Sequence, residues 1–208
     1  MGLFITFEGP EGSGKTTQIR LLAAELTKQG CQVLLTREPG GTKIGNAIRE
    51  ILLNQAHEEM SSRAEALLFS AARAQLVAEV VRPALNAGKI VLSDRYIDST
   101  VAYQGYGRKQ ELSDLRMLGE FATGRLMPDL TLFLDIEPAE GLRRKLACDG
   151  VEWNRMESQT LAFHAAVREG YFQLARQEPG RWRVLDATQE VDMIQREIQR
   201  QVANLVSV

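Results

Sequence analysis

The chain has 208 residues, 44% of them hydrophobic and 25% charged, and a formal net charge of −2. These values are typical of a soluble globular protein, and the length predicts a single domain over residues 1–208. The charge argues against a general nucleic-acid binder, so local groups of Arg and Lys would have to bind any anionic ligand. We expect neither a membrane span nor a signal peptide, because the chain has no long apolar run and no basic-then-apolar start.

The cysteines and histidines form no metal-binding pattern. Cys31 and Cys148 lie far apart, and we interpret both as reduced thiols of a cytoplasmic protein. His57 and His164 have no partner pattern for a metal ligand or a nucleophile, so we interpret them as structural or surface residues.

The first predicted element is a strand over Leu3–Phe7, and a candidate phosphate-binding loop follows it. Residues 9–16 fit the pattern Gly-x-x-x-x-Gly-Lys-Ser/Thr, and a helical pattern covers 15–29. Glycines let successive backbone N–H groups point at a phosphate, and the helix adds its positive N-terminal end. Lys15 would contact the β- and γ-phosphates of a nucleotide, and the Thr16 hydroxyl would help to bind Mg²⁺. We therefore predict an ATP site over Gly9, Pro10, Glu11, Gly12, Ser13, Gly14, Lys15, Thr16 and Thr17.

The second strand is predicted over Gln32–Thr36, and a loop of sequence Arg37-Glu38-Pro39-Gly40-Gly41-Thr42 follows it. A charged pair at the carboxyl end of a strand favours a functional loop over a simple connection. A helix is predicted over 43–54, and Arg49 lies about one turn inside it. Its side chain points either back to the same cleft or into solvent.

A helix is predicted over 61–87, and it carries Phe69 and Arg73 on one face because they are four residues apart. An aromatic ring beside an Arg is suited to stacking on a base and donating to its carbonyl groups. The alternative is an ordinary boundary between core and surface.

The third strand is predicted over Ile90–Ser93, and polar and aromatic residues follow it. Asp94 suits a ligand of Mg²⁺ through water, or it orients Arg95, which would bring a fork of donors to a phosphate. Ser99, Thr100, Tyr103 and Gln104 supply the hydrogen bonding and stacking that recognise a nucleobase.

The remaining predicted strands are Leu130–Asp135 and Trp182–Leu185, and the remaining predicted helices are 113–124, 138–148, 157–177 and 189–205. Gly30 and Gly88 lie where helices would end. Between two of the helices, the basic run Arg143-Arg144-Lys145 and the segment Asn154-Arg155-Met156-Glu157 suit a mobile lid over phosphates, about 143–157. A solvated cationic helix face is the alternative.

Strands that alternate with helices predict an α/β fold, here a doubly wound five-stranded parallel sheet of the P-loop NTPase type. Ligands in such sheets bind at the carboxyl ends of the strands. We therefore expect the polar ends of the first three strands to contribute to one shared site.

Together these motifs resemble the thymidylate kinase (dTMP kinase) family of the bacterial type, over nearly the whole chain. The resemblance rests on Phe7–Thr17, Thr36–Thr42, Asp94-Arg95-Tyr96 and Ala102–Gly105. It implies the reaction ATP + dTMP ⇌ ADP + dTDP with Mg²⁺, which supplies dTTP synthesis for DNA replication. It also implies small-molecule substrates, no nucleic-acid or membrane partner, and a homodimer formed through long helices such as 61–87.

The resemblance also assigns roles residue by residue. Lys15 and Thr16 match the ATP phosphate and magnesium positions, and Arg95 matches the residue between the donor and acceptor phosphates. Arg49 matches a ligand of the dTMP phosphate, and Phe69 matches the ring that stacks on thymine. Arg73 matches the donor to the thymine carbonyl, and Thr100 and Gln104 match neighbours of the base edge. Glu11, Glu38 and Tyr103 match groups near the deoxyribose, and we expect Ser99 among the substrate-binding residues.

Family members differ in the position of an assisting arginine. Position 11 is Glu, so the type with basic residues in the lid is implied, and the candidates are Arg143, Arg144 and Arg155. Many bacterial members have Asp-Arg-x-Glu at the end of the lid, whereas this chain has Asn154-Arg155-Met156-Glu157. Arg155 is the first candidate.

Three alternatives remain open from the sequence. The first is another nucleoside or nucleoside-monophosphate kinase, which the base pocket of Phe69, Arg73, Thr100 and Gln104 would distinguish. The second is a nucleotide-dependent switch, although the chain has no Asn-Lys-x-Asp run of the kind that reads guanine. The third is a scaffold with a relict loop, against which Lys15-Thr16 and Asp94-Arg95 argue.

Overall fold

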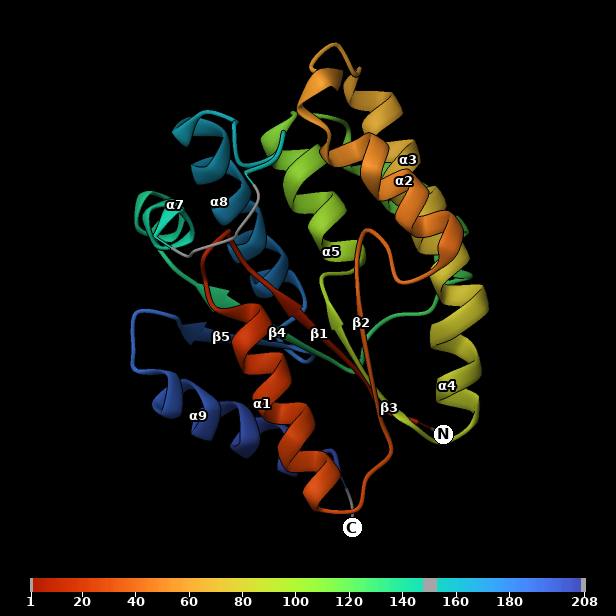
Figure 1. The fold of residues 1–208 in the computed structure, drawn as a ribbon, viewed down its shortest axis with the longest axis vertical. Coiled ribbons are helices and arrows are strands. Elements are labelled where there is room, and N and C mark those ends of the chain that lie inside the picture. Colours follow the sequence, from red (N-terminus) through yellow and green to blue (C-terminus); the bar gives the residue numbers. More distant parts are fainter. Residues whose placement is uncertain (1, 148–152, 207–208) are drawn as a thin grey trace.

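The computed structural model describes residues 2–147 and 153–206, and its core is a five-stranded parallel sheet (Figure 1). The order across the sheet is β2-β3-β1-β4-β5, and all neighbouring pairs are parallel. The strands are β1 (Phe4–Glu8), β2 (Val33–Arg37), β3 (Ile90–Asp94), β4 (Leu130–Asp135) and β5 (Trp182–Asp186). Every predicted strand is confirmed to within one residue at each end, and the predicted α/β fold is confirmed with them.

The prediction that all the strands are buried is wrong at the two edges of the sheet. The central strands β1, β3 and β4 are almost completely buried, whereas Leu35 of β2 and Val184 of β5 are each 48% exposed. An edge strand has a neighbour on one side only, so the covering helices leave part of it open to solvent.

Helices cover both faces of the sheet, as the doubly wound prediction requires. On one face, α1 (Lys15–Lys28) and α9 (Val191–Ala203) pack through Leu22 and Ile198 against Ile5 of β1. On the other, Phe4 of β1 packs with the helices that begin at Ser62, and Phe133 of β4 packs against α8 (Leu161–Gln177). Side chains of consecutive strand residues alternate between the two faces, so both layers obtain an apolar surface from the same strands.

The other helices are α2 (Lys43–Leu53), α3 (Ser62–Leu76), α4 (Arg82–Asn86), α5 (Ile97–Thr100), α6 (Leu112–Thr123) and α7 (Pro138–Leu146). A short 3₁₀ turn covers Gln55–His57. Gly30 and Gly88 have φ of 85° and 78° and follow the ends of α1 and α4, which confirms both predicted helix ends. Figure 1 shows α2 and α7 on opposite sides of the carboxyl ends of the strands.

The predicted helix 61–87 is helical over 62–86, but its hydrogen bonding widens to a π-helical turn, η2 (Val77–Val81), between α3 and α4. Helix α8 begins at Leu161 and not at 157, because the Thr160 side chain accepts a hydrogen bond from the backbone N–H of Phe163.

Besides the 3₁₀ turn at Gln55–His57, the predicted set lacks α5 and the π-helical segment η3 (Val101–Gly107). Glycines disfavour a helix, which is why the sequence gives little signal here. Packing overrides this preference, since a Cβ at Gly107 would lie 2.5 Å from the Phe163 ring of α8. The close approach of η3 and α8 therefore needs a residue without a side chain at this position.

Among the residues that the structure describes, no helix is both long and apolar enough to cross a membrane. Cys31 is half-buried, and Cys148 lies outside the described residues, so the reduced state of the two thiols stays a prediction.

Candidate active site

A cleft of about 880 Å³ opens at the carboxyl ends of β1, β2 and β3. The three strands lie side by side in the sheet, so the polar segments that follow them meet at one place, as the sequence predicts. The lining includes the loop after β1, Arg37 at the end of β2 with Glu38 after it, and Asp94 at the end of β3 with Arg95 after it. Arg49 of α2 and Arg144 of α7 lie in the same lining.

The loop after β1 has the geometry of a phosphate-binding loop. Gly12 and Gly14 have positive φ, and Gly14 stands at the N-terminal end of α1. A Cβ at Gly12 would lie 1.9 Å from the carbonyl oxygen of Gly141, so glycine allows α7 to approach the loop closely. The loop therefore presents the positive end of α1 to the cleft and carries α7 along its outer side.

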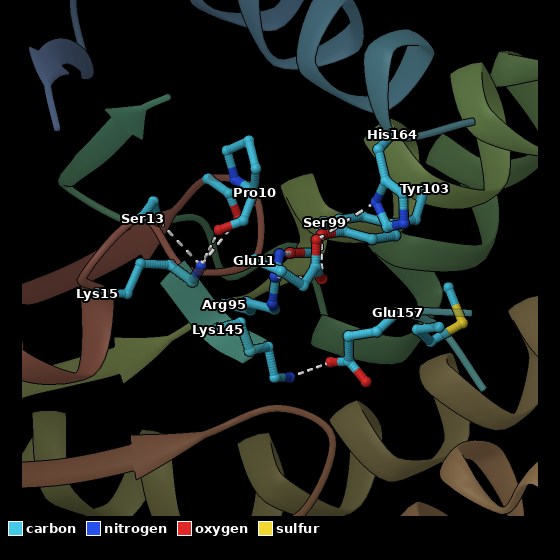
Figure 2. A network of polar contacts seen from close by, with 12 residues as sticks. Pro10, Glu11, Ser13, Lys15, Arg95, Ser99, Tyr103, Lys145, Glu157 and His164 are labelled. Carbon is cyan, nitrogen blue, oxygen red and sulfur yellow. Dashed lines mark hydrogen bonds and ion pairs between the residues drawn. The ribbon is translucent and has the colours of Figure 1, made fainter. Parts of the chain in front are cut away.

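Lys15 is buried at the centre of this loop. Its Nζ donates to the carbonyl oxygens of Gly9 (2.9 Å) and Pro10 (2.7 Å) and to the Ser13 hydroxyl (3.2 Å), as Figure 2 shows for Pro10 and Ser13. Burial, and after it the charge of Arg95, lower the pKa of Lys15 to about 8 against the opposing effects of Asp94, Glu11 and Glu8. A bound anion would relieve both effects, which is typical of a cation prepared for phosphate.

The loop after β1 is bonded directly to the end of β3. The Thr16 hydroxyl donates to Asp94 Oδ2 at 3.0 Å. A hydroxyl and a carboxylate at this position form the donor set that Mg²⁺ uses beside nucleotide phosphates. Within the described residues, no group of three or more His, Cys, Asp or Glu side chains is placed to hold a metal.

Arg95 follows β3 with a φ of 73°, an uncommon conformation for a residue with a side chain. Its guanidinium binds Glu11 Oε1 at 3.0 Å, the Tyr171 hydroxyl at 3.0 Å and Ser99 Oγ at 3.3 Å. It also lies over the Tyr103 ring, 4.9 Å from the centroid. These contacts fix the guanidinium in the cleft, between the phosphate loop and η3 (Figure 2).

Glu11 is a buried carboxylate held ionised by its neighbours. Burial alone would raise its pKa, but Arg95, His164, Lys15 and Tyr103 together hold the pKa of Glu11 well below its usual range. Tyr103 donates to Oε1 at 2.6 Å, and His164 Nδ1 lies 3.6 Å from Oε2. The interpretation of His164 as a structural residue fits this buried position.

A second buried carboxylate, Glu8, binds two of the side chains that hold Arg95. Its Oε2 accepts hydrogen bonds from Ser99 Oγ (2.6 Å) and the Tyr171 hydroxyl (2.8 Å), which both contact Arg95. Its Oε1 accepts the backbone N–H of Tyr96. Burial and the charge of Asp98 raise the pKa of Glu8 to about 7, although Arg95 lowers it. Neither Glu8 nor Tyr171 is among the site residues predicted from the sequence. The polar residue at the end of β1 is the one sequence signal, and it points to Glu8 alone.

The opposite side of the cleft contains the candidate base pocket. Phe69 is half-buried in the lining, whereas Arg73 is 1% exposed and bonded to the protein itself. Arg73 donates to Glu38 Oε2 (2.7 Å), Thr100 Oγ1 (3.0 Å) and the Tyr96 carbonyl (3.1 Å). Burial raises the pKa of Glu38 although Arg73 lowers it, and its Oε1 has no partner among the described residues.

Two further arginines reach the cleft near the end of β2. Arg49 donates to the Pro39 carbonyl at 3.0 Å, and Arg37 lies in the same lining. Burial lowers the pKa of Arg49, and the charges of Arg37 and Arg95 lower it as well, against Asp94 and Glu157. Positive charges that repel each other in a cleft favour an anionic ligand.

The candidate lid arginines are placed in three different ways. Arg144 lines the cleft and donates to the Ala187 carbonyl at 2.8 Å and to Glu140. Arg143 points away from it and is 71% exposed beside Glu140. Arg155 is buried against Glu65, 2.6 Å from Oε2. Lys145, which was not a candidate, lines the cleft and pairs with Glu157 (Figure 2).

Most of the predicted site residues come together in this cleft. Five do not line it: Gly9 and Pro10, which bind Lys15 through their carbonyls, and Arg73, Arg143 and Arg155. The rest do, namely Glu11, Gly12, Ser13, Gly14, Lys15, Thr16, Thr17, Glu38, Arg49, Phe69, Asp94, Arg95, Ser99, Thr100, Tyr103, Gln104 and Arg144. The central part of the predicted lid, 148–152, lies outside the described residues.

One edge of the parallel sheet carries a phosphate-binding loop and an Asp-Arg pair at the end of a strand. Aromatic and amide side chains line the cleft opposite this loop. This arrangement defines the class of nucleoside-monophosphate kinases. A family model described as thymidylate kinase matches residues 7–198. The chain therefore belongs to the thymidylate kinase family, and it is a kinase that phosphorylates dTMP.

Individual relatives agree with this family. The chain is 53% identical to the thymidylate kinase of Roseiflexus sp. (strain RS-1), over 95% of this chain and 92% of that protein. It is 50% identical to the thymidylate kinase of Bacillus licheniformis, over 93% and 91% of the two chains. A crystal structure of thymidylate kinase from Ehrlichia chaffeensis matches with a TM-score of 0.78 and 33% identity, over 97% and 98% of the chains.

Proposed function

We propose that the cleft binds ATP and dTMP together with Mg²⁺ and transfers the γ-phosphoryl group to the dTMP phosphate, producing ADP and dTDP. One observation carries this proposal: Lys15, Thr16, Asp94 and Arg95 line the same cleft as Phe69 and Gln104. A phosphate donor and a base-bearing acceptor would thus lie in one cavity, where they are held for direct transfer.

Thr16 and Asp94 would hold Mg²⁺. The hydrogen bond between Thr16 Oγ1 and Asp94 Oδ2 places a hydroxyl and a carboxylate side by side at the phosphate loop, and this donor set fits the ion. Mg²⁺ binds proteins through one or two side chains plus phosphates and water, so a small protein ligand set is sufficient. When bound, Mg²⁺ neutralises charge on the nucleotide phosphates.

The cations around the cleft would stabilise the transferred group. The acceptor phosphate is already an oxyanion, so the reaction needs alignment and charge neutralisation more than a general base. Lys15 would exchange the carbonyls of Gly9 and Pro10 for phosphate oxygens, and Arg95 would donate to the donor and acceptor phosphates. Arg144 and Lys145 supply positive charge from the α7 side.

The acceptor would lie across the cleft from the phosphate loop. Phe69 would stack on thymine, with Thr100 and Gln104 at the base edge and Arg73 behind Thr100. Glu11, Glu38 and Tyr103 would surround the deoxyribose, and Arg49 and Ser99 would lie near the phosphate. The unpartnered Glu38 Oε1 suits a hydrogen-bond donor of the ligand.

The exposed apolar side chains of α3 and α6 support the homodimer. Leu67, Met117 and Phe121 are 57%, 70% and 87% exposed on two helices that pack together. A stable contact between two copies would bury this surface. Light scattering during size-exclusion chromatography measures the number of subunits. We place the proposed enzyme in the cytoplasm, where it would act on small molecules.

A coupled ADP-release assay with Mg·ATP and dTMP, dUMP, dCMP, dGMP or AMP tests the proposed reaction. We expect strong turnover of dTMP. Preference for another monophosphate would retain the phosphate side of the site and reject the base pocket. ATP binding without acceptor-dependent ADP release would instead favour a nucleotide-dependent switch.

A further inference from the structure

Glu65 of α3 is a buried carboxylate outside the cleft that contacts one of the residues inside it. Its side chain is 1% exposed. Oε1 accepts hydrogen bonds from Gln104 Nε2 (2.9 Å) and Arg108 Nε (3.1 Å). Oε2 accepts from Arg108 Nη2 (3.1 Å) and lies 2.6 Å from Arg155 Nη1. One carboxylate therefore joins the base pocket to Arg155, near the end of the predicted lid.

The surroundings of Glu65 keep it ionised. Burial alone would raise its pKa, but hydrogen bonds from Arg108 and Gln104, with the charges of Arg108 and Arg155, lower the pKa of Glu65. An ionised carboxylate accepts hydrogen bonds and donates none. Gln104 must therefore turn its NH₂ group toward Glu65, and this fixes the opposite orientation of its carbonyl oxygen.

Gln104 lines the cleft in company with Phe69 and Thr100. In the described part of the chain, its Nε2 is bonded to Glu65 and its Oε1 accepts no hydrogen bond from the protein. A side-chain amide has one acceptor end and one donor end, and Glu65 occupies the donor end. The end left for a ligand is the acceptor.

We propose that Glu65 is a positioning residue for base specificity: it holds the Gln104 carbonyl toward the cleft so that the site accepts a pyrimidine with a hydrogen on N3. This inference rests on the proposed function, because it concerns the base of the dTMP acceptor. Arg108 and Arg155 contribute by holding the Glu65 carboxylate in place and ionised.

The chemistry of the two pyrimidines gives the selectivity. Thymine carries N3–H, which donates to the Gln104 carbonyl. Cytosine has an unprotonated N3 acceptor, which would face a second acceptor. A buried polar group without its partner lowers affinity by roughly ten- to a hundredfold. Uracil carries the same N3–H as thymine, so Glu65 does not affect the choice between dTMP and dUMP.

Glu65→Gln tests the proposal directly. Arg155 Nη1 and Arg108 Nη2 would keep the new carbonyl oxygen at the Oε2 position, which leaves an NH₂ group facing Gln104 and Arg108 Nε. Gln104 would then turn over and present its own NH₂ to the cleft. We expect the ratio of kcat/KM for dTMP to that for dCMP to fall about tenfold or more. The change should lie in KM for dTMP, with KM for ATP and the ratio of dTMP to dUMP unchanged.

Two further variants distinguish an effect of Glu65 that acts through Gln104 from a general loss of structure. Gln104→Met removes the amide, so adding Glu65→Gln to it should not change the dTMP to dCMP ratio further. Asp98→Asn removes another buried carboxylate, which binds Arg181 through two hydrogen bonds of 2.7 Å outside the cleft. It should lower the unfolding temperature and leave the ratio unchanged. A folded Glu65→Gln protein with the original ratio, or an equal loss in the Gln104→Met background, would overturn the proposal.

The wild-type protein provides the decisive measurement if Glu65→Gln fails to fold. Thymidine monophosphate methylated on N3 lacks the N3–H, and we expect its affinity, measured by calorimetry, to fall about tenfold or more relative to dTMP. Undiminished affinity for this probe would overturn the proposal. A wild-type protein that does not phosphorylate dTMP at all would instead reject the proposed function, so the two failures are distinguishable.

Discussion

Thr16 and Asp94 are 78 positions apart in the chain, and the Thr16 hydroxyl donates to Asp94 Oδ2 at 3.0 Å. The contact exists because β1 and β3 are adjacent parallel strands and both end at the same edge of the sheet. It connects the phosphate loop to the Asp-Arg pair, and it defines the position at which Mg²⁺ would bind between them.

The first prediction concerns Mg²⁺. Asp94→Asn keeps the shape of the side chain but removes the charge that attracts the cation. We expect the Mg²⁺ concentration that gives half-maximal activity to rise about tenfold or more, because a carboxylate ligand is lost. The measurement is a Mg²⁺ titration of the coupled assay at a constant concentration of ATP.

Asp129→Asn is a matched control for this titration. Asp129 precedes β4 at the far end of the sheet, where its Oδ2 accepts the backbone N–H of Phe4 at 2.8 Å. The variant should cost some stability and leave the Mg²⁺ requirement unchanged. An unchanged requirement in Asp94→Asn would leave Asp94 only the role of orienting its neighbours.

The second prediction concerns the two cations nearest the phosphates. Lys15→Ala and Arg95→Ala should each reduce kcat roughly a hundredfold or more, since each removes a few kcal/mol of charge stabilisation. Steady-state kinetics with Mg·ATP and dTMP measure this loss, and circular dichroism checks that both proteins are folded. Near wild-type turnover of either variant would contradict its assignment.

The strands and the phosphate side of the site could be predicted from the sequence because their signals are local. Short apolar runs mark β1 to β5, and the glycine spacing of residues 9–16 marks the loop without knowledge of the fold. The adjacency of Thr16 and Asp94 needed one further step, the rule that parallel strands present their carboxyl ends at one edge.

The lid and the support of Arg95 could not be predicted because they depend on packing between distant segments. Arg143, Arg144 and Lys145 are consecutive, yet their directions around α7 differ, and only the last two reach the cleft. Arg155 pairs with Glu65, and Tyr171 reaches Glu8 from α8 across 163 positions. The spacing of residues in the sequence does not predict such pairs, because they form only when the helices pack against the sheet and against one another.

The third prediction concerns Arg73. Arg73→Ala should weaken dTMP binding more than ATP binding, because Arg73 holds Thr100 and Glu38 at the acceptor side. It should also lower the free energy of unfolding by about 3 kcal/mol, since it leaves the buried Glu38 carboxylate without its partner. Calorimetry with each nucleotide and urea unfolding measure the two effects. Equal losses of affinity for the two nucleotides would remove Arg73 from the acceptor pocket.

The fourth prediction separates the candidate lid cations. Lys145 lines the cleft, whereas Arg155 is buried against Glu65. Lys145→Met should therefore reduce kcat by about tenfold or more, and it should also cost some stability because it leaves the buried Glu157 carboxylate without its cation. Arg155→Met should lower the unfolding temperature and change kcat less. The opposite pattern would return the assisting role to Arg155, and Arg143→Met, outside the cleft, serves as the control for a lost positive charge.

The last prediction concerns the dependence of stability on pH. The pKa of Glu8 is raised from 4.5 to about 7 by burial first and by Asp98 second. Between these values the folded protein binds a proton that the unfolded chain has released. Stability therefore decreases as pH rises through this range, and the contribution of Glu8 is roughly 3 kcal/mol.

Glu8→Gln removes this titration and keeps the shape of the side chain. The unfolding free energy of the wild type minus that of Glu8→Gln should thus fall by roughly 3 kcal/mol from pH 4.5 to pH 8. Other titrating groups, such as Glu11, are present in both proteins and cancel in the difference. Urea unfolding at several pH values measures it. A difference that is constant with pH would show that Glu8 is ionised throughout and that its hydrogen bonds outweigh its burial.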